Sequence, residues 1–213
     1  MARKAKIAGK PKIFCVGCNK TGTTSLKAAL EELGFITGDQ REAELMLEDW
    51  AKRDFSKITS YCHSAQAFQD VPFSLPETYK VMDQAFPGSR FILTIRDSSE
   101  QWYSSIVRFH GKIWGNGRTP PTREDLQEAT YIYKGRPWQS NRLIFNTPED
   151  DPYHRETLLE FYEDHNRSVE QYFSEREDDL LVINTAKGED YGRLCRFLDV
   201  SPMRDAFPWE NKT

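Results

Sequence analysis

The sequence predicts an α/β fold in three layers, with a central parallel sheet flanked by helices. Three short apolar runs, at residues 13–16, 91–95 and 180–183, have the length of buried strands. Amphipathic helical patterns lie between these runs. Strands that alternate with helices form parallel sheets, because each helix returns the chain to the starting edge of the sheet. The chain has 213 residues, which is enough to bury such a core, and we expect residues 1–213 to form a single domain.

Weaker strand signals and six helical patterns complete the expected order. Residues 35–37 and 67–69 are the weaker strand candidates. Helices are expected near residues 26–33, 43–50, 79–86, 99–110, 158–173 and 191–198, each with apolar residues at helical spacing. Gly34 follows the first helix at the position of a C-terminal glycine cap, and Pro87 with Gly88 ends the third. Ser98 and Gln101 have the spacing of a capping box for the fourth.

Charge and hydropathy exclude several classes of function. The net charge is −4 and the pI is near 5.7. Proteins that bind nucleic acid over a broad surface are usually basic, so we expect no nucleic-acid partner. No apolar run approaches the roughly 20 residues of a membrane helix, so we expect no membrane span. Residues 1–11 form a basic tail without the apolar segment of a secretory signal, and the expected location is therefore cytoplasmic.

The four cysteines fit a reduced chain. They stand at positions 15, 18, 62 and 195. Cys15 and Cys18 have the spacing of a C-x-x-C redox or metal motif, but no second pair of Cys or His residues completes a zinc site. The interpretation that we favour places Cys15 in a buried strand and Cys18 in the loop after it.

The stretch between the first strand and the first helix has the residues of a phosphate-binding loop. It reads Gly17-Cys18-Asn19-Lys20-Thr21-Gly22-Thr23-Thr24-Ser25. Glycines allow a tight turn that directs N–H groups inward, and the N-terminus of the following helix adds partial positive charge. Lys20 adds a full charge, and the hydroxyl side chains add donors. The loop therefore predicts a bound phosphate and a P-loop-like fold, with a strand–turn–helix corner and a chance lysine as the alternative.

The loop differs from the Walker A loop of proteins that hydrolyse ATP. A Walker A loop has its lysine directly after the second glycine, followed by a hydroxyl residue that binds Mg²⁺. Here Gly17 and Gly22 keep the separation, but Thr23 occupies the lysine position and Lys20 precedes Gly22 by two residues. This order argues against a small-molecule or nucleotide kinase of P-loop type, which stays as the alternative enzyme.

The segment from Lys20 to Leu26 resembles the 5′-phosphosulfate loop of sulfotransferases, commonly written P-K-[ST]-G-T-[ST]. The resemblance implies a sulfotransferase-like domain that uses 3′-phosphoadenosine 5′-phosphosulfate, releases adenosine 3′,5′-bisphosphate and needs no metal. It assigns these residues to the donor: Lys20, Thr21, Gly22, Thr23, Thr24 and Ser25. Cys18 and Asn19 replace the aromatic-Pro pair that usually precedes the lysine, so the chain is more similar to a bacterial-type branch than to the cytosolic steroid and phenol enzymes.

A second motif is similar to the 3′-phosphate site of the same family. Arg96 follows a predicted strand, and Ser104 comes eight residues later on a predicted helix. An arginine can hold a phosphate through two N–H groups, and a serine hydroxyl adds a further bond. Ligands of parallel sheets bind beyond the carboxyl ends of the strands, where Arg96 is expected. Looser similarity extends to the C-terminus, where the resemblance assigns Asn211 and Lys212 to the nucleotide.

The reaction that the resemblance implies moves a sulfuryl group from a phosphate to a hydroxyl or amine acceptor by in-line displacement. Lys20 would stabilise the leaving oxygen, and a base must take the proton of the acceptor. The K-T-H sequence that carries the histidine base of the cytosolic branch does not occur here. Asp70 is our first candidate for the base because it follows a weak strand, and His63 is the second. A helix cap, or a salt bridge to Lys20 or Arg96, is the alternative role for Asp70.

Residues 111–151 interrupt the alternation of strands and helices. The segment is rich in Gly, Pro and aromatic residues, and we expect an irregular insertion that is either a lid over the substrate or a structural element packed by its own aromatics. Its aromatic side chains would suit an apolar pocket for a small-molecule acceptor, whose identity the sequence does not give. A non-catalytic module that binds a 3′-phosphoadenosine nucleotide is the alternative from another functional class, and the oligomeric state stays open.

Overall fold

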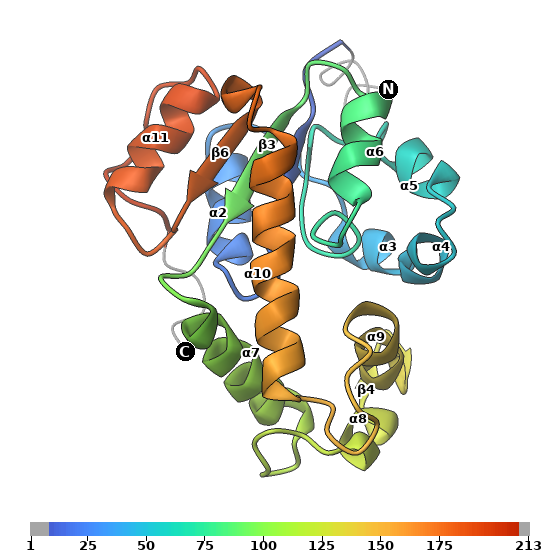
Figure 1. Cartoon of the computed structure of the whole chain (residues 1–213). Coiled ribbons are helices and arrows are strands. Elements are labelled where there is room, and N and C mark those ends of the chain that lie inside the picture. The colour runs from blue at the N-terminus through green and yellow to red at the C-terminus, as the bar shows by residue number, and fades with distance from the viewer. Residues whose placement is uncertain (1–8, 209–213) are drawn as a thin grey trace. The chain divides into compact units, whose positions relative to one another are not determined.

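The computed structural model describes residues 9–208, and their contacts divide them into two compact units (Figure 1). The first unit contains residues 9–95 and 166–208, and the second contains residues 96–165. Among residues 9–208, none of the helices combines the length and the apolar composition that a membrane crossing demands.

The first unit contains a sheet of four parallel strands in the order β2-β1-β3-β6. The strands are β1 (Ile13–Cys15), β2 (Ala67–Phe68), β3 (Arg90–Thr94) and β6 (Leu180–Ile183). Phe14 in β1 pairs with Phe68 on one side and with Phe91 on the other. The predicted α/β fold with a central parallel sheet is therefore confirmed.

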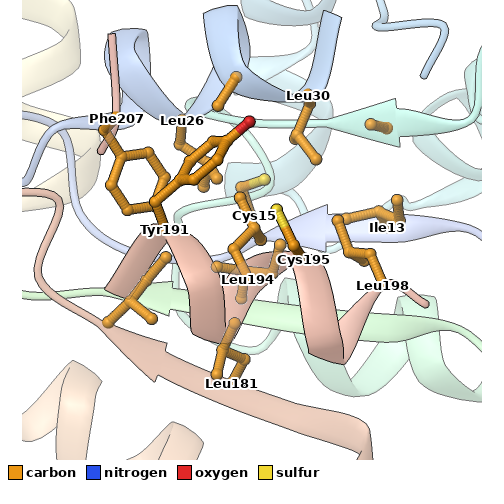
Figure 2. Close-up of a cluster of buried hydrophobic side chains, with 14 residues drawn as sticks. Ile13, Cys15, Leu26, Leu30, Leu181, Tyr191, Leu194, Cys195, Leu198 and Phe207 are labelled. Carbon is orange, nitrogen blue, oxygen red and sulfur yellow. The ribbon is translucent and has the colours of Figure 1, made fainter. Parts of the chain in front are cut away.

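One face of the sheet packs against α2 (Thr23–Glu32) and α11 (Glu189–Phe197). Side chains alternate between the two faces along a strand, so Ile13 and Cys15 share this face. Figure 2 shows Leu26 and Leu30 of α2 on one side of the cluster and Leu194 of α11 on the other. This packing fixes α2 directly behind the end of β1, where the phosphate loop begins.

The opposite face carries a cluster of aromatic side chains. The ring of Phe14 lies 5.7 Å from that of Phe68, 5.8 Å from that of Phe73 and 5.5 Å from that of Phe91. The Phe91 ring lies 4.7 Å from that of Phe173, which directly follows α10 (Arg155–Tyr172). Helices α5 (Ser56–Tyr61) and α6 (Thr78–Ala85) add further rings to this layer. Burial on both faces explains why the strands read as continuous apolar runs.

Helix α2 ends as its sequence predicts. Gly34 adopts a left-handed conformation with φ +88°, and its N–H donates to the carbonyl of Glu31 (3.0 Å). The N–H of Phe35 donates to the carbonyl of Leu30 (2.9 Å). These two bonds form a Schellman motif, which satisfies carbonyls that the last helical turn leaves without partners.

Two sequence predictions in the next segment are wrong. Residues 35–37 are not a strand, because the chain makes one parallel bridge from Thr37 to Ala67 and then turns into a helix. The single helix expected near residues 43–50 is two helices, α3 (Gln40–Glu44) and α4 (Leu47–Ala51). The N–H groups of Leu45 and Met46 bond to carbonyls three residues earlier, and this tighter turn separates the two helices.

The second unit contains α7 (Ser99–Trp114), α8 (Arg123–Glu128), α9 (Arg136–Ile144), the first part of α10, and a hairpin of β4 (Thr130–Tyr131) and β5 (Tyr133–Lys134). The Ser98 side chain accepts from the N–H of Gln101 (3.1 Å), so Ser98 is the N-cap of α7 as predicted. The predicted capping box is not completed, because the Gln101 side chain accepts from the N–H of Asp97 (3.0 Å) instead of that of Ser98. The expectation of an irregular segment at 111–151 is wrong. Two of its Gly and Pro residues begin a helix: Gly135 is the N-cap of α9, and Pro137 lies in the first turn.

Candidate active site

The loop between β1 and α2 is held at the carboxyl edge of the sheet. The N–H of Val16 donates to the carbonyl of Ile92 in β3 (2.8 Å) and so continues the strand pairing. The Thr21 hydroxyl donates to the carbonyl of Cys18 (2.6 Å) and lies 2.5 Å from the hydroxyl of Thr94. Because Thr21 is fully buried, its side chain fixes the shape of the loop rather than facing a ligand.

Two positions in this loop require glycine because other strands approach closely. A Cβ atom at Gly17 would collide with the side chain and backbone of Thr94, at the end of β3. Gly22 has φ +97°, and a Cβ there would collide with the hydroxyl of Thr185, which follows β6. The loop is therefore enclosed by the ends of three neighbouring strands, β1, β3 and β6.

The N-terminus of α2 has the features of an anion-binding site. Its N-cap residue is Gly22, which forms no side-chain cap, and its first turn has no acidic residue. The first backbone bond of the helix runs from the N–H of Leu26 to the carbonyl of Gly22 (3.0 Å). The N–H groups of Thr23 and Thr24 therefore come before this first bond and lie at the positive end of the helix dipole. This is the arrangement that binds phosphate groups in other proteins.

Lys20 lies in the same loop in a left-handed conformation. Its φ is +73°, which costs about 1–2 kcal/mol for a residue with a side chain. The fixed loop around it must offset this cost, and such strain is often found where ligands bind. The side chain is half-buried, and its positive charge lowers the pKa of Asp70. Lys20 and Asp70 therefore interact electrostatically.

Asp70 lies two residues after the end of β2 and contacts the start of α2. Its φ of +55° ends the extended strand. The side chain of Thr23 hydrogen-bonds to its carboxyl group, and Gln69 Nε2 donates to Oδ2 (3.2 Å). The second oxygen, Oδ1, is buried and has no hydrogen-bond partner within the described part of the chain. This carboxyl group therefore has capacity for one more donor.

The surroundings of Asp70 shift its protonation toward neutral pH. The pKa of Asp70 is raised to about 6, chiefly by burial, and the charge of the nearby Glu44 acts in the same direction. The bond from Thr23 and the charges of Lys20 and Lys27 act in the opposite direction. An ordinary aspartate has a pKa of about 3.9, so the effect of burial outweighs these opposing interactions. A carboxyl group with a pKa near 6 at the ligand edge of a sheet is a candidate acid–base group.

A short turn ties the Asp70 segment to the phosphate loop. The N–H of Ser74 donates to the carbonyl of Asp70 (2.9 Å), and the Ser74 hydroxyl donates to Asn19 Oδ1 in the loop (3.2 Å). The structure thus brings Lys20, Thr23 and Asp70 together, although they come from two separate segments of the sequence.

His63 lies at the opposite edge of the sheet. Its ring packs against Phe86, ahead of β3, with 5.5 Å between ring centroids. Lys12, at the start of β1, marks the same edge, because its ammonium donates to the carbonyl of Ala65 (2.6 Å) ahead of β2. All four strands run from this edge toward the phosphate loop, so the structure does not bring His63 to the loop. We do not retain it as a candidate base.

Arg96 and Ser104 belong to the second unit. The N–H of Arg96 donates to the Tyr162 hydroxyl (2.9 Å), and the Tyr162 ring stacks on that of Trp102 (4.8 Å). Partial burial lowers the pKa of the Arg96 guanidinium. Ser104 is exposed on α7. Asn211 and Lys212 lie outside the described residues.

The C-x-x-C pair is buried rather than poised for redox chemistry. Cys15 lies in β1 and Cys18 in the loop after it, as we expected, and both are free thiols. Burial raises the pKa of Cys15 well above its usual range and that of Cys18 to about 12. Reactive thiols have lowered pKa values and partial exposure, so these two thiols pack as small apolar groups.

Three residues near the loop were missed from the sequence. Thr94 ends β3 and Thr185 follows β6, so the rule that the carboxyl ends of parallel strands meet at one edge would have found both. Glu44 acts on Asp70 from α3, and nothing in its local sequence marks it.

Comparison with known protein families identifies the family of this chain. No curated protein was found to match this chain. A family model described as a sulfotransferase domain matches residues 12–213, which include the sheet, the phosphate loop and the second unit. Since the match covers nearly the whole length, the chain belongs to the sulfotransferase domain family.

Proposed function

We propose that this chain transfers a sulfuryl group from 3′-phosphoadenosine 5′-phosphosulfate to a hydroxyl or amine of a small-molecule acceptor. The observation that carries the proposal is the uncapped N-terminus of α2, with Lys20 in the loop before it. Sulfotransferases generally use this donor, and the family match covers the loop.

The residues of the loop fit an anionic phosphosulfate group. The N–H groups of the first turn of α2 supply directed donors, and Lys20 supplies a full positive charge. The Thr24 hydroxyl is exposed on the same turn and adds a donor. The donor, when bound, supplies an activated sulfuryl group on a phosphate that leaves readily.

Lys20 stabilises the negative charge that develops on the leaving phosphate oxygen. A fixed cation is effective in this role because it needs no rearrangement as the charge forms. The left-handed backbone of Lys20 and the buried Thr21 next to it support this assignment, since both restrict where the lysine side chain starts.

Asp70 takes the proton from the acceptor. Its position beside Thr23, at the start of α2, supports this role, and so does the capacity of Oδ1 for one more donor. With a pKa of about 6, most of the carboxyl group is ionised at pH 7, and it is a stronger base than an ordinary aspartate.

Arg96 and Ser104 bind the 3′-phosphate. Arg96 directly follows Ile95, whose N–H donates to the carbonyl of Ile183 (2.9 Å) at the carboxyl edge of the sheet. The backbone of Arg96 therefore leaves the sheet at its ligand edge, which supports the assignment.

A thermal-shift panel tests the donor. Adenosine 3′,5′-bisphosphate in EDTA should stabilise the protein by about 2.7 kcal/mol at 100 times its dissociation constant, and AMP at the same concentration should do so much less. Arg96→Ala should remove most of this difference, whereas the matched control Arg108→Ala, an exposed arginine on α7, should keep it.

Other outcomes of the panel would contradict the proposal. Stabilisation by ATP with Mg²⁺ alone would indicate a P-loop kinase. Strong binding of the bisphosphate without any turnover of the sulfated donor would indicate a nucleotide-binding module. Equal losses for AMP and bisphosphate in Arg96→Ala would show that Arg96 acts through folding.

A further inference from the structure

A second carboxylate, Glu44, is buried next to the turn that carries Asp70. Glu44 is 8% exposed and lies in α3, one turn after Gln40. Gln40 Nε2 donates both to Glu44 Oε1 (3.1 Å) and to the carbonyl of Val71 (3.3 Å). Val71 is the residue after Asp70, so one amide group links Glu44 to the backbone of the Asp70 turn.

Helix α3 is fixed near β2 by contacts of Gly38 and Asp39, the two residues that precede it. The N–H of Gly38 donates to the carbonyl of Ala67 in β2 (2.9 Å), and a Cβ at Gly38 would press on the ring of Phe68 at 2.8 Å. The Tyr61 hydroxyl donates to the carbonyl of Asp39, the N-cap of α3 (2.6 Å). Because its helix is anchored in this way, Glu44 has little freedom to withdraw from Asp70.

Three charged groups and one hydroxyl act on the Asp70 carboxyl from the elements around it. Lys20 from the loop and Lys27 from α2 favour its charged form, as does the bond from Thr23. Glu44 from α3 favours its protonated form. Two carboxyl groups that interact in a buried setting release their protons in two coupled steps, because each charge opposes the other.

We infer that Glu44 is a positioning residue for Asp70: the Gln40 amide donates both to Glu44 Oε1 and to the carbonyl of Val71, so Glu44 holds the turn that carries the Asp70 carboxyl. This inference rests on the proposed role of Asp70 as the base. It adds that a residue of α3, distant in sequence and outside the phosphate loop, sets the pH range in which that base works.

The experiment follows the Asp70 carboxyl by ¹³C NMR titration of the full chain and, in parallel, the pH profile of donor turnover. Asp70→Asn identifies the resonance. Glu44→Gln removes the charge at nearly the same shape and should lower the pKa of Asp70 by roughly one unit, the lower end of the effect of a nearby charge. The acid limb of the pH profile of turnover should shift to lower pH by the same amount as the pKa of Asp70. Glu42→Gln, the same change at an exposed position of α3, should shift neither the pKa of Asp70 nor the pH profile of turnover.

A further variant keeps the test decisive if Glu44→Gln folds poorly. Glu44→Asp keeps the charge and should keep the raised pKa of Asp70. An unmoved pKa of Asp70 in Glu44→Gln, or a lowered one in Glu44→Asp, would overturn the inference. If the pKa moves while the turnover profile does not, Glu44 acts on Asp70 as inferred, and the proposed role of Asp70 as base is what fails.

Discussion

Two helix N-termini in this protein each combine a threonine with an aspartate and use them differently. At the start of α8, the Thr122 side chain accepts from the N–H of Asp125 (3.2 Å), and the Asp125 carboxylate accepts from the N–H of Thr122 (2.9 Å). Arg118 donates two further bonds to Asp125, each of 3.1 Å. At the start of α2, Thr23 meets Asp70, which comes from a different strand.

The comparison shows how the number of donors decides what a carboxylate can do. Hydrogen bonds, first from the Thr122 backbone and then from Arg118, hold the pKa of Asp125 well below its usual range. Burial with fewer donors raises the pKa of Asp70 to about 6. Asp125 is thus permanently charged and closes its helix end with local partners. The start of α2 instead has N–H groups in position for an anion, next to a carboxyl group that changes protonation near neutral pH.

The largest expected effect is the loss of the base. Asp70→Asn keeps the shape of the side chain and should reduce transfer by about 10²–10⁴-fold, with nucleotide affinity nearly unchanged. Asp125→Asn is the matched control: it weakens the capping box, so it should lower the free energy of unfolding and leave turnover unchanged. Turnover of the sulfated donor, with water as acceptor until a better one is known, provides the assay. Normal turnover in Asp70→Asn would remove Asp70 from the mechanism.

Lys20→Ala should have the next largest effect. One positioned group on a developing negative charge contributes roughly 2.7–4 kcal/mol, so turnover should fall by about 10²–10³-fold. Lys52→Ala, an exposed lysine whose ammonium lies 3.7 Å from Glu48, is the control and should behave like the unaltered protein. Turnover near the normal value in Lys20→Ala would show that the N-terminus of α2 alone stabilises the charge on the leaving phosphate oxygen.

The pH dependence of turnover and of stability also distinguishes Asp70 from Asp125, because only Asp70 changes protonation near pH 6. A base must be ionised, so turnover at low substrate should fall about tenfold per unit below a pH of about 6, where Asp70 takes up its proton. The same shift acts on stability with the opposite sign. An unfolded aspartate ionises near pH 3.9, before the folded one, so Asp70 makes the fold less stable as pH rises from about 4 to about 6. Asp70→Asn should remove both effects; denaturant unfolding at pH 4 and pH 8 tests the second.

A carboxylate placed at the start of α2 should stabilise the helix and harm its proposed function. Thr24 is exposed in the first turn, and Thr24→Asp adds a negative charge near the positive end of the helix dipole. We expect a gain of about 0.3–1 kcal/mol in the protein alone. Repulsion should weaken the bisphosphate by roughly tenfold or more. Thr24→Asn adds no charge, so it should change neither the stability of the protein nor its affinity for the bisphosphate. An unchanged affinity in Thr24→Asp would show that the phosphate binds elsewhere.

The elements that were predicted from the sequence are those with local signals. Continuous apolar runs revealed three of the four strands, because burial on both faces leaves no polar alternation. The turn from β1 into α2 was visible because its glycines, its lysine and its hydroxyls are contiguous, and its role as a phosphate loop stays a prediction. The same reasoning failed at residues 111–151, where Gly135 and Pro137 begin a helix but resemble loop residues when read singly.

The site was only partly predictable, since its electrostatics come from distant segments. Asp70 was a candidate by its place after a strand, yet its raised pKa depends on burial and on Glu44, which no local pattern reveals. His63 was a candidate by residue type alone, and the course of the strands puts it at the opposite edge of the sheet. Chemistry-bearing residues can be listed from a sequence, but which of them meet depends on the order and direction of the strands.

The last expected effect lies at the start of α8, where it changes stability but not binding, and it completes the comparison. Thr122→Ala removes the oxygen that accepts from the N–H of Asp125, and losses of this kind cost about 0.5–2 kcal/mol. The free energy of unfolding in denaturant should fall by that amount, and Thr122→Ser should restore it. Bisphosphate affinity should not change, because this cap is made of local partners. If Thr122→Ala instead weakened the nucleotide as strongly as Thr24→Asp, the start of α8 would take part in binding, and the contrast between the two helix ends would fail.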